Sequence, residues 1–144
     1  MIKLKIGIAC DHRGYKIKND IIKKLQEKYE VIDYGTNSEE SKDYPIYAFK
    51  LCEDIKNIDF GILLCGTGIG ISIAANKVKK IRCARVVSIE DAYLARYHNN
   101  ANVIALSSEQ NIDNLIELIE KFINTEFSNE PRHIRRNEMI DNYD

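Results

Sequence analysis

Apolar and polar positions alternate along this chain with two periods, one typical of strands and the other of helices. Short apolar runs that end at glycine, asparagine or aspartate predict strands, whereas apolar residues spaced three and four apart predict helices. The predicted strands are Lys3–Ala9, Val31–Tyr34, Gly61–Leu64, Cys83–Ser88 and Asn102–Leu106. The predicted helices are Tyr15–Tyr29, Ile46–Ile55, Ile71–Val78, Glu90–Tyr97, Ile112–Ile123 and a polar tail, Arg132–Asp144.

Strands that alternate with helices throughout the chain predict βαβ crossovers and therefore a parallel sheet covered on both faces. We expect an α/β fold: a single Rossmann-like three-layer domain over residues 1–144, with about five parallel strands and a C-terminal helical tail. The first predicted helix has apolar residues at helical spacing, with lysines on the other face.

The composition narrows the classes of function. The chain has 144 residues, 44% of them hydrophobic and 30% charged, with a net charge of −1. This balance argues against a nucleic-acid or membrane-surface partner, and no apolar run reaches the length of a membrane span. Four cysteines without CxxC pairing, and without metal-ligand spacing to the three histidines, predict reduced thiols in a cytoplasmic protein. Cys52 and Cys83 lie in apolar segments and are expected in the core.

The stretch Phe60–Lys77 reads as a buried strand, a glycine loop and a helix. Three glycines at alternate positions, Gly66, Gly68 and Gly70, allow a tight turn whose N–H groups point at one spot, beside a helix N-terminus. Such a loop favours an anion, either a phosphate or an oxyanion formed during reaction. Cys65 at its mouth suits a nucleophile or a base. The alternatives are a loop that needs glycine for packing alone and a cysteine that is merely a small apolar side chain.

Polar side chains follow other predicted strands at the same sheet edge. Asp11 and His12 come directly after the first strand, where Asp11 either caps a helix or holds a sugar hydroxyl. His98-Asn99-Asn100 is either a helix C-terminal turn or part of a site. Arg132 and Arg136 are four apart, so they share one helix face and could bind one phosphate unless they form a solvated charge run.

These motifs together resemble the ribose-5-phosphate isomerase B family, which also holds allose- and galactose-6-phosphate isomerases. The resemblance covers essentially the whole chain. It is carried by ACDHRGY at 9–15, DYGT at 33–36, DYP at 43–45, CGTGIGISIAANK at 65–77, YHNNANVIAL at 97–106 and PRHIRR at 131–136.

The resemblance implies an aldose–ketose isomerase that works through a cis-enediolate without a metal or cofactor. Cys65 would be the base that moves a proton between C1 and C2. Thr67 and the amides of the loop would stabilise the enediolate oxygen, and His98 would open the furanose ring, with Asp11 near the sugar. The implied substrate-binding residues are His12, Tyr44, Gly66, Gly68, Ile69, Gly70, Asn99, Arg132 and Arg136.

Similar proteins are homodimers with shared active sites. The resemblance therefore implies a dimer or a tetramer in which the His98 segment and the tail, residues 128–144, reach into the partner's site. One position departs from the family pattern, because Glu109 stands where an arginine commonly helps to bind substrate. Three alternatives remain beside ribose 5-phosphate isomerisation: a six-carbon sugar phosphate as substrate, a non-catalytic sugar-phosphate sensor, and thiol-redox chemistry between Cys10 and Cys65.

Overall fold

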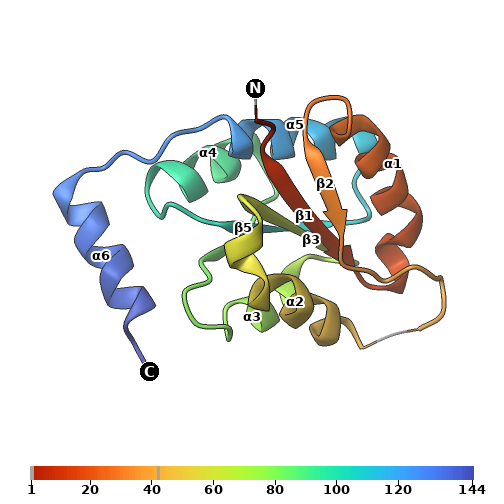
Figure 1. Cartoon of the computed structure of the whole chain (residues 1–144), viewed down its shortest axis with the longest axis horizontal. Coiled ribbons are helices and arrows are strands. Elements are labelled where there is room, and N and C mark those ends of the chain that lie inside the picture. Colours follow the sequence, from red (N-terminus) through yellow and green to blue (C-terminus); the bar gives the residue numbers. More distant parts are fainter. Residues whose placement is uncertain (1, 42) are drawn as a thin grey trace.

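The computed structural model describes residues 2–41 and 43–144 and has a five-stranded parallel sheet at its centre (Figure 1). The strand order is β2-β1-β3-β5-β4. The strands are β1 Lys5–Cys10, β2 Glu30–Asp33, β3 Phe60–Cys65, β4 Cys83–Arg85 and β5 Val103–Ser107. The predicted α/β class, the parallel sheet and the number of strands are confirmed.

Helices cover both faces of the sheet. They are α1 Tyr15–Leu25, α2 Tyr44–Glu53, α3 Ile69–Ala75, α4 Ile89–Tyr97, α5 Ile112–Ile123 and α6 Pro131–Asp141, with 3₁₀ turns η1 His12–Gly14 and η2 Ile55–Asn57. One buried cluster joins α1, α4 and α5 to the sheet, and a second joins α2 and α3 to the opposite face. Figure 1 shows these layers, with α6 standing at one end of the molecule.

Several predicted element ends differ from the structure. The fourth strand stops at Arg85, although Cys83–Ser88 is predicted, because Ser88 instead caps α4 by accepting a hydrogen bond from the amide of Asp91. The first helix ends at Leu25, four residues before its predicted end at Tyr29. Apolar residues continue beyond the end of this helix, because Tyr29 is not helical but still packs against the core.

The prediction that the first helix carries its lysines opposite the apolar face is wrong for Lys18. Lys18 lies three residues before Ile21 and seven before Leu25, on the apolar stripe of α1, and it is fully buried. Its ammonium donates to Asp33 Oδ1 at 2.7 Å and to the carbonyl of Thr36 at 2.6 Å, so the charge is paired inside the fold. Cys83, which was expected in the core, is partly buried and packs against the cluster under α2 and α3, on the short edge strand β4. No helix of the described residues is long and apolar enough to cross a bilayer.

Candidate active site

The candidate site lies at the carboxyl ends of β1 and β3, the two strands where the sheet order reverses direction. Crossovers leave these neighbouring strands on opposite faces of the sheet, which opens a crevice beyond their ends. The chain continues the pairing past β1, because the amide of Asp11 donates to the carbonyl of Leu64 at 3.1 Å. A hollow of about 310 Å³ opens there, lined by Asp11, His12, Arg13, Tyr44, Cys65, Gly66, Thr67 and Gly70.

The glycine loop turns its carbonyl groups away from this hollow. The carbonyl oxygens of Cys65, Gly66 and Thr67 accept hydrogen bonds from Ser108 N (2.9 Å), Ser107 Oγ (2.7 Å) and Arg85 Nε (3.0 Å), respectively. A planar trans peptide points its N–H opposite to its C=O, so the following N–H groups face the other way. The loop thus presents donors where negative charge would be stabilised.

Gly68 is the loop position that requires glycine. Its φ of +81° is left-handed, and a Cβ there would come within 3.1 Å of the carbonyl carbon of Leu106 on β5. Any side chain would therefore strain the backbone and push the loop from the sheet. Gly70 meets a different neighbour, because a Cβ there would collide with the phenol of Tyr44, which lines the same hollow.

Cys65 is the reactive group that this loop surrounds. Its side chain is 6% exposed, and its sulfur accepts a hydrogen bond from the amide of Gly68 at 3.1 Å. A donated N–H stabilises a thiolate more than a thiol, which is the property that a base needs.

Cys10 lies on the other face of the sheet and cannot serve Cys65. The register pairs Cys10 with Leu64, and Cys10 packs with the cluster under α1 and α5, whereas Cys65 packs with the cluster under α2 and α3. Burial raises the pKa of the Cys10 thiol to about 12. The alternative of redox chemistry between these two cysteines is therefore wrong.

Asp11 and His12 both line the hollow. Asp11 is 6% exposed and caps η1, since its Oδ1 accepts from the amide of Gly14 at 3.0 Å. The cap and a role in the site are compatible, because a carboxylate has a second oxygen.

The structure separates the remaining predicted site residues from this hollow. His98, Asn99, Arg132 and Arg136 are not among the described residues that line it. His98 instead lies with its ring centroid 4.6 Å from that of His133 on α6, and Asn99 donates to Asn137 Oδ1 at 3.0 Å. Arg132 forms an exposed ion pair with Glu130 at 3.0 Å. The His98 turn and α6 form a second group of site candidates.

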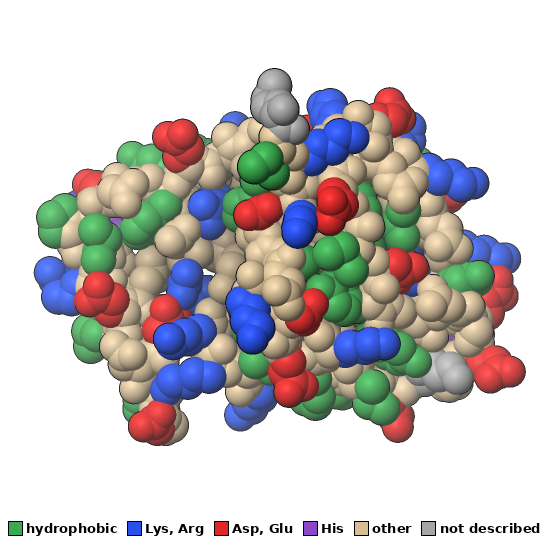
Figure 2. All heavy atoms as spheres, in the orientation of Figure 1, with side chains coloured by type: hydrophobic (Ala, Val, Ile, Leu, Met, Phe, Trp, Pro, Cys, Tyr) green, Lys and Arg blue, Asp and Glu red, His purple; other side chains and the backbone are tan. Residues whose placement is uncertain are grey.

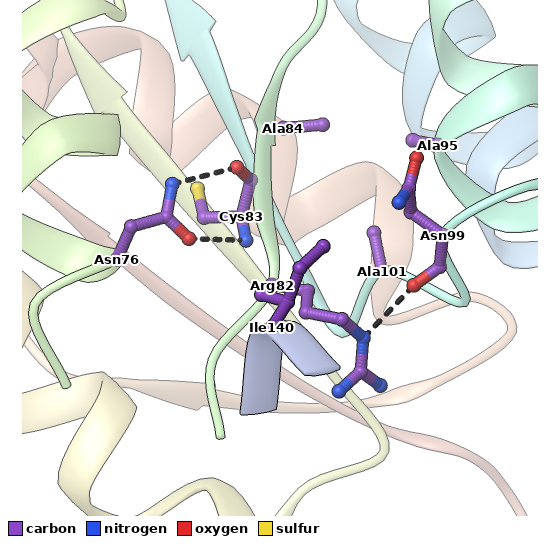
Figure 3. Close-up of a pocket in the computed structure, with 8 residues that line it drawn as sticks. All are labelled: Asn76, Arg82, Cys83, Ala84, Ala95, Asn99, Ala101 and Ile140. Atoms are coloured by element: carbon purple, nitrogen blue, oxygen red, sulfur yellow. Dashed lines mark hydrogen bonds between the residues drawn. The ribbon is translucent and has the colours of Figure 1, made fainter. Parts of the chain in front are cut away.

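A second cavity of about 300 Å³ lies beneath α6, lined partly by Arg82, Cys83, Asn99 and Ile140 (Figure 3). Its polar groups already have partners. Arg82 binds both carboxylate oxygens of Asp141 at 2.6 and 2.7 Å and the carbonyl of Asn99 at 2.8 Å. Asn76 binds the backbone of Cys83 through both atoms of its amide. The Arg82 hydrogen bonds hold α6 to the residue before β4, and through it to the His98 turn.

Charges of both signs are interspersed over the face seen in Figure 2, which matches the net charge of −1. Within residues 2–41 and 43–144, no three His, Cys, Asp or Glu side chains are grouped so that they could hold a metal ion. Glu109 is exposed, forms no ion pair with another described residue, and its amide donates to Ser107 Oγ at 3.2 Å.

Sequence reasoning missed three residues that shape the loop: Arg13, Arg85 and Ser107. Two of them could have been found from their positions in the sequence: Arg13 lies inside the ACDHRGY motif, and Ser107 ends β5, the strand beside β3. Arg85 had none, because its contact with Thr67 depends on where α3 returns the chain to β4.

The fold and the site define a small α/β enzyme of the sugar-phosphate isomerase class. The family described as Ribose/Galactose Isomerase matches residues 6–140, so the chain belongs to that family.

Individual relatives agree with this assignment. Ribose-5-phosphate isomerase B of Escherichia coli is 47% identical over 72% of each chain. The crystal structure of a ribose 5-phosphate isomerase from Thermotoga maritima superposes with a TM-score of 0.93 at 44% identity, covering 97% of this chain and 99% of the other. Ribose-5-phosphate isomerase B from Mycoplasma genitalium with bound ribulose-5-phosphate has a TM-score of 0.91 at 40% identity, covering 99% and 97%.

Proposed function

We propose that this protein interconverts ribose 5-phosphate and ribulose 5-phosphate by aldose–ketose isomerisation. The observation that carries the proposal is Cys65 at the end of β3, with the Gly68 N–H on its sulfur and the loop carbonyls turned away from the hollow. One thiolate beside converging N–H donors supplies both a base and a site for the oxyanion it creates. Similar proteins carry this activity in their names, and one was solved with ribulose-5-phosphate.

The reaction follows from these groups. The Cys65 thiolate removes the proton from C2 of the open-chain aldose, and negative charge develops on O1. The loop amides and the Thr67 hydroxyl stabilise the resulting cis-enediolate. A proton then moves from O2 to O1 as Cys65 returns a proton to C1, which yields the ketose. The reaction balances without an oxidant or reductant.

The other roles complete the proposal. His98 opens the furanose ring, and Asp11 and Tyr44 hold sugar oxygens together with Asn99. His12, Arg132 and Arg136 bind the phosphate.

Because His98 and the arginines of α6 lie outside the hollow, we propose a homodimer in which they enter the partner's hollow. Exposed apolar side chains on α6, Met139 at 67% and Ile140 at 54%, support such an interface. Reduced thiols fit a cytoplasmic enzyme.

The test is a side-by-side assay with ribose 5-phosphate, allose 6-phosphate and galactose 6-phosphate. We expect preference for the five-carbon substrate, and Cys65→Ala should lower turnover by about a thousandfold because the base is lost. Cys83→Ala is the matched control, since this thiol lies outside the hollow. Preference for a six-carbon substrate would overturn the proposed substrate but leave the proposed mechanism intact. Full turnover in Cys65→Ala would refute the base, and no turnover of any of the three would favour a sensor.

A further inference from the structure

Arg13 is a charged residue of the hollow to which the proposed reaction gives no role. It is the middle residue of η1, directly after Asp11 and His12, and it lines the hollow. Its side chain folds over the glycine loop, since a Cβ built on Gly66 would come within 2.8 Å of Arg13 Nη1 and 3.3 Å of Cδ. The guanidinium therefore covers the residue that follows Cys65.

The charge of Arg13 is not neutralised by the part of the chain that the structure describes. Four other arginines have protein partners: Arg82 binds Asp141, Arg132 binds Glu130, Arg85 binds the carbonyl of Thr67, and Arg96 binds the carbonyls of Ala101 and Thr125, whereas Arg135 and Arg136 of α6 resemble Arg13 in having no hydrogen bond or ion pair among the described residues. Within residues 2–41 and 43–144, no hydrogen bond or ion pair holds the Arg13 guanidinium. The nearest carboxylate in sequence, Asp11, already accepts from the amide of Gly14.

Arg13 is also the one Lys or Arg among the described residues that line the hollow. The arginines of α6 do not reach it within the same chain. One protomer thus places a single unpaired guanidinium next to His12, at the mouth of the pocket that holds the reacting thiol. An exposed guanidinium with free N–H groups matches a phosphate, because its planar fork donates two parallel hydrogen bonds to an anion of that geometry.

We propose that Arg13 binds the phosphate of the substrate, as a cation supplied by the same chain as Cys65. This inference rests on the proposed function for the identity of the substrate. The phosphate carries its charge in every state of the substrate, whereas the enediolate charge exists only during reaction. A cation for the phosphate lowers KM and leaves kcat largely unchanged, because it stabilises the bound ground state and the transition state equally.

The experiment compares Arg13→Ala and Arg13→Lys with the wild-type enzyme in two readouts. The first is binding of inorganic phosphate, by calorimetric titration, and the second is KM and kcat for ribose 5-phosphate. Arg13→Ala should weaken phosphate binding and raise KM by about tenfold, the size of one lost charge-assisted contact. Arg13→Lys should recover part of both, since it keeps the charge but not the fork.

Lys16→Ala is the matched control. Lys16 is an exposed cation one turn further along, paired at the surface with Glu39 at 3.4 Å, and it does not line the hollow. Its loss changes net charge equally but should leave both readouts unchanged. Equal phosphate affinity in Arg13→Ala and Lys16→Ala overturns the proposal. So does a fall in kcat at unchanged KM, which would assign the guanidinium to the reacting carbons. Because phosphate binding needs no turnover, it tests Arg13 even if the wild-type protein isomerises none of the sugars.

Discussion

At the scale of single residues, the four cysteines differ in what surrounds their thiols. Burial raises the pKa of Cys10 and of Cys52 to about 12, and burial also raises the pKa of Cys83. A protonated thiol reacts slowly with alkylating agents, because the thiolate is the nucleophile. Cys65 alone lines the hollow and accepts an N–H on its sulfur.

We predict that iodoacetamide at about pH 8 alkylates Cys65 well before the other three thiols of the folded protein. Peptide mass spectrometry over time would measure the four rates, and loss of isomerase activity should follow the Cys65 rate. Saturating inorganic phosphate would serve as the control, since an occupied hollow should slow Cys65 only. Labelling of Cys10 at the same rate as Cys65 would contradict the assignment.

Lys18 is a charged residue that the fold buries completely, so its ammonium must be paired to offset the loss of hydration. Its ammonium is 0% exposed and donates to Asp33 Oδ1, to the Thr36 carbonyl and to Asn37 Oδ1, which fixes the segment after β2 against α1. The same segment extends the sheet pairing, because the amide of Thr36 donates to the carbonyl of Cys10 at 3.0 Å. Lys18 thereby supports the residues that lead into Asp11.

Replacing Lys18 by methionine should lower the free energy of unfolding by about 3 kcal/mol, because the partly exposed Asp33 carboxylate and the buried Thr36 carbonyl lose their donor. Urea denaturation would measure the change. Lys16→Met provides the comparison, since Lys16 has a side chain that is 81% exposed and should change stability by less than about 0.5 kcal/mol. Equal stabilities of the two variants would show that the buried ammonium is dispensable.

At the scale of elements, α6 is held to the rest of the chain mainly by polar contacts around the His98 turn. Asn137 is 7% exposed and donates to the carbonyl of His98 at 3.1 Å, and Arg82 links Asp141 to the same turn. His133 contacts the same turn through its ring, whose centroid lies 4.6 Å from that of His98. These contacts join α6 to the turn that carries the proposed ring-opening residue, His98.

Burial lowers the pKa of His133 below its ordinary value of 6.5, and the nearby Arg132, His98 and Arg136 lower it further against the opposing effect of Glu130. The folded state therefore binds this proton less readily than the unfolded state. The contribution of His133 to docking is complete above about pH 6.5 and is lost as the pH falls through the lowered value.

Acidification from about pH 7.5 to about pH 5.5 should thus loosen α6. Hydrogen exchange of the peptide 131–141, corrected for the intrinsic pH dependence, would show faster exchange at the lower pH. His133→Asn should remove most of the pH dependence, because asparagine does not titrate. An unchanged pH profile in that variant would place the titration elsewhere.

At the scale of the whole molecule, the topology divides the proposed machinery into two groups. The crevice between β1 and β3 gathers Asp11, His12 and Cys65, whereas the end of α4 and α6 gather His98 with the tail arginines. A two-fold dimer joins such groups reciprocally, since the patch that each subunit offers is the one it receives.

Subunit mixing tests this arrangement. Cys65→Ala and His98→Ala subunits carrying different affinity tags would be co-expressed, and the hybrid dimer purified through both tags. If each site draws Cys65 from one subunit and His98 from the other, the hybrid has one intact site and about half of the wild-type activity. If each chain supplies both residues to one site, the hybrid should be as inactive as the parent variants.

The sequence by itself determined the order and type of the elements and the placement of Cys65 and the glycine loop at the sheet edge. Both follow from local patterns: apolar periodicity specifies strands and helices, and parallel strands bring their carboxyl ends to one edge. The resemblance to ribose-5-phosphate isomerase B, drawn from six motifs, was confirmed by the family match. The roles of the individual site residues stay predictions.

Only the tertiary structure decided which side chains meet. The register between β1 and β3 pairs Cys10 with Leu64, so Cys10 and Cys65 lie on opposite faces of the sheet. The pattern within either strand does not specify this register. Packing of α1 against the segment after β2 gave the buried Lys18 ammonium its partners, which helical periodicity alone does not specify. The turn after β1 folded Arg13 over Gly66, 53 positions further along the chain by the printed numbering. Each depends on contacts between distant segments, whose geometry is set by the packed core and not by local periodicity.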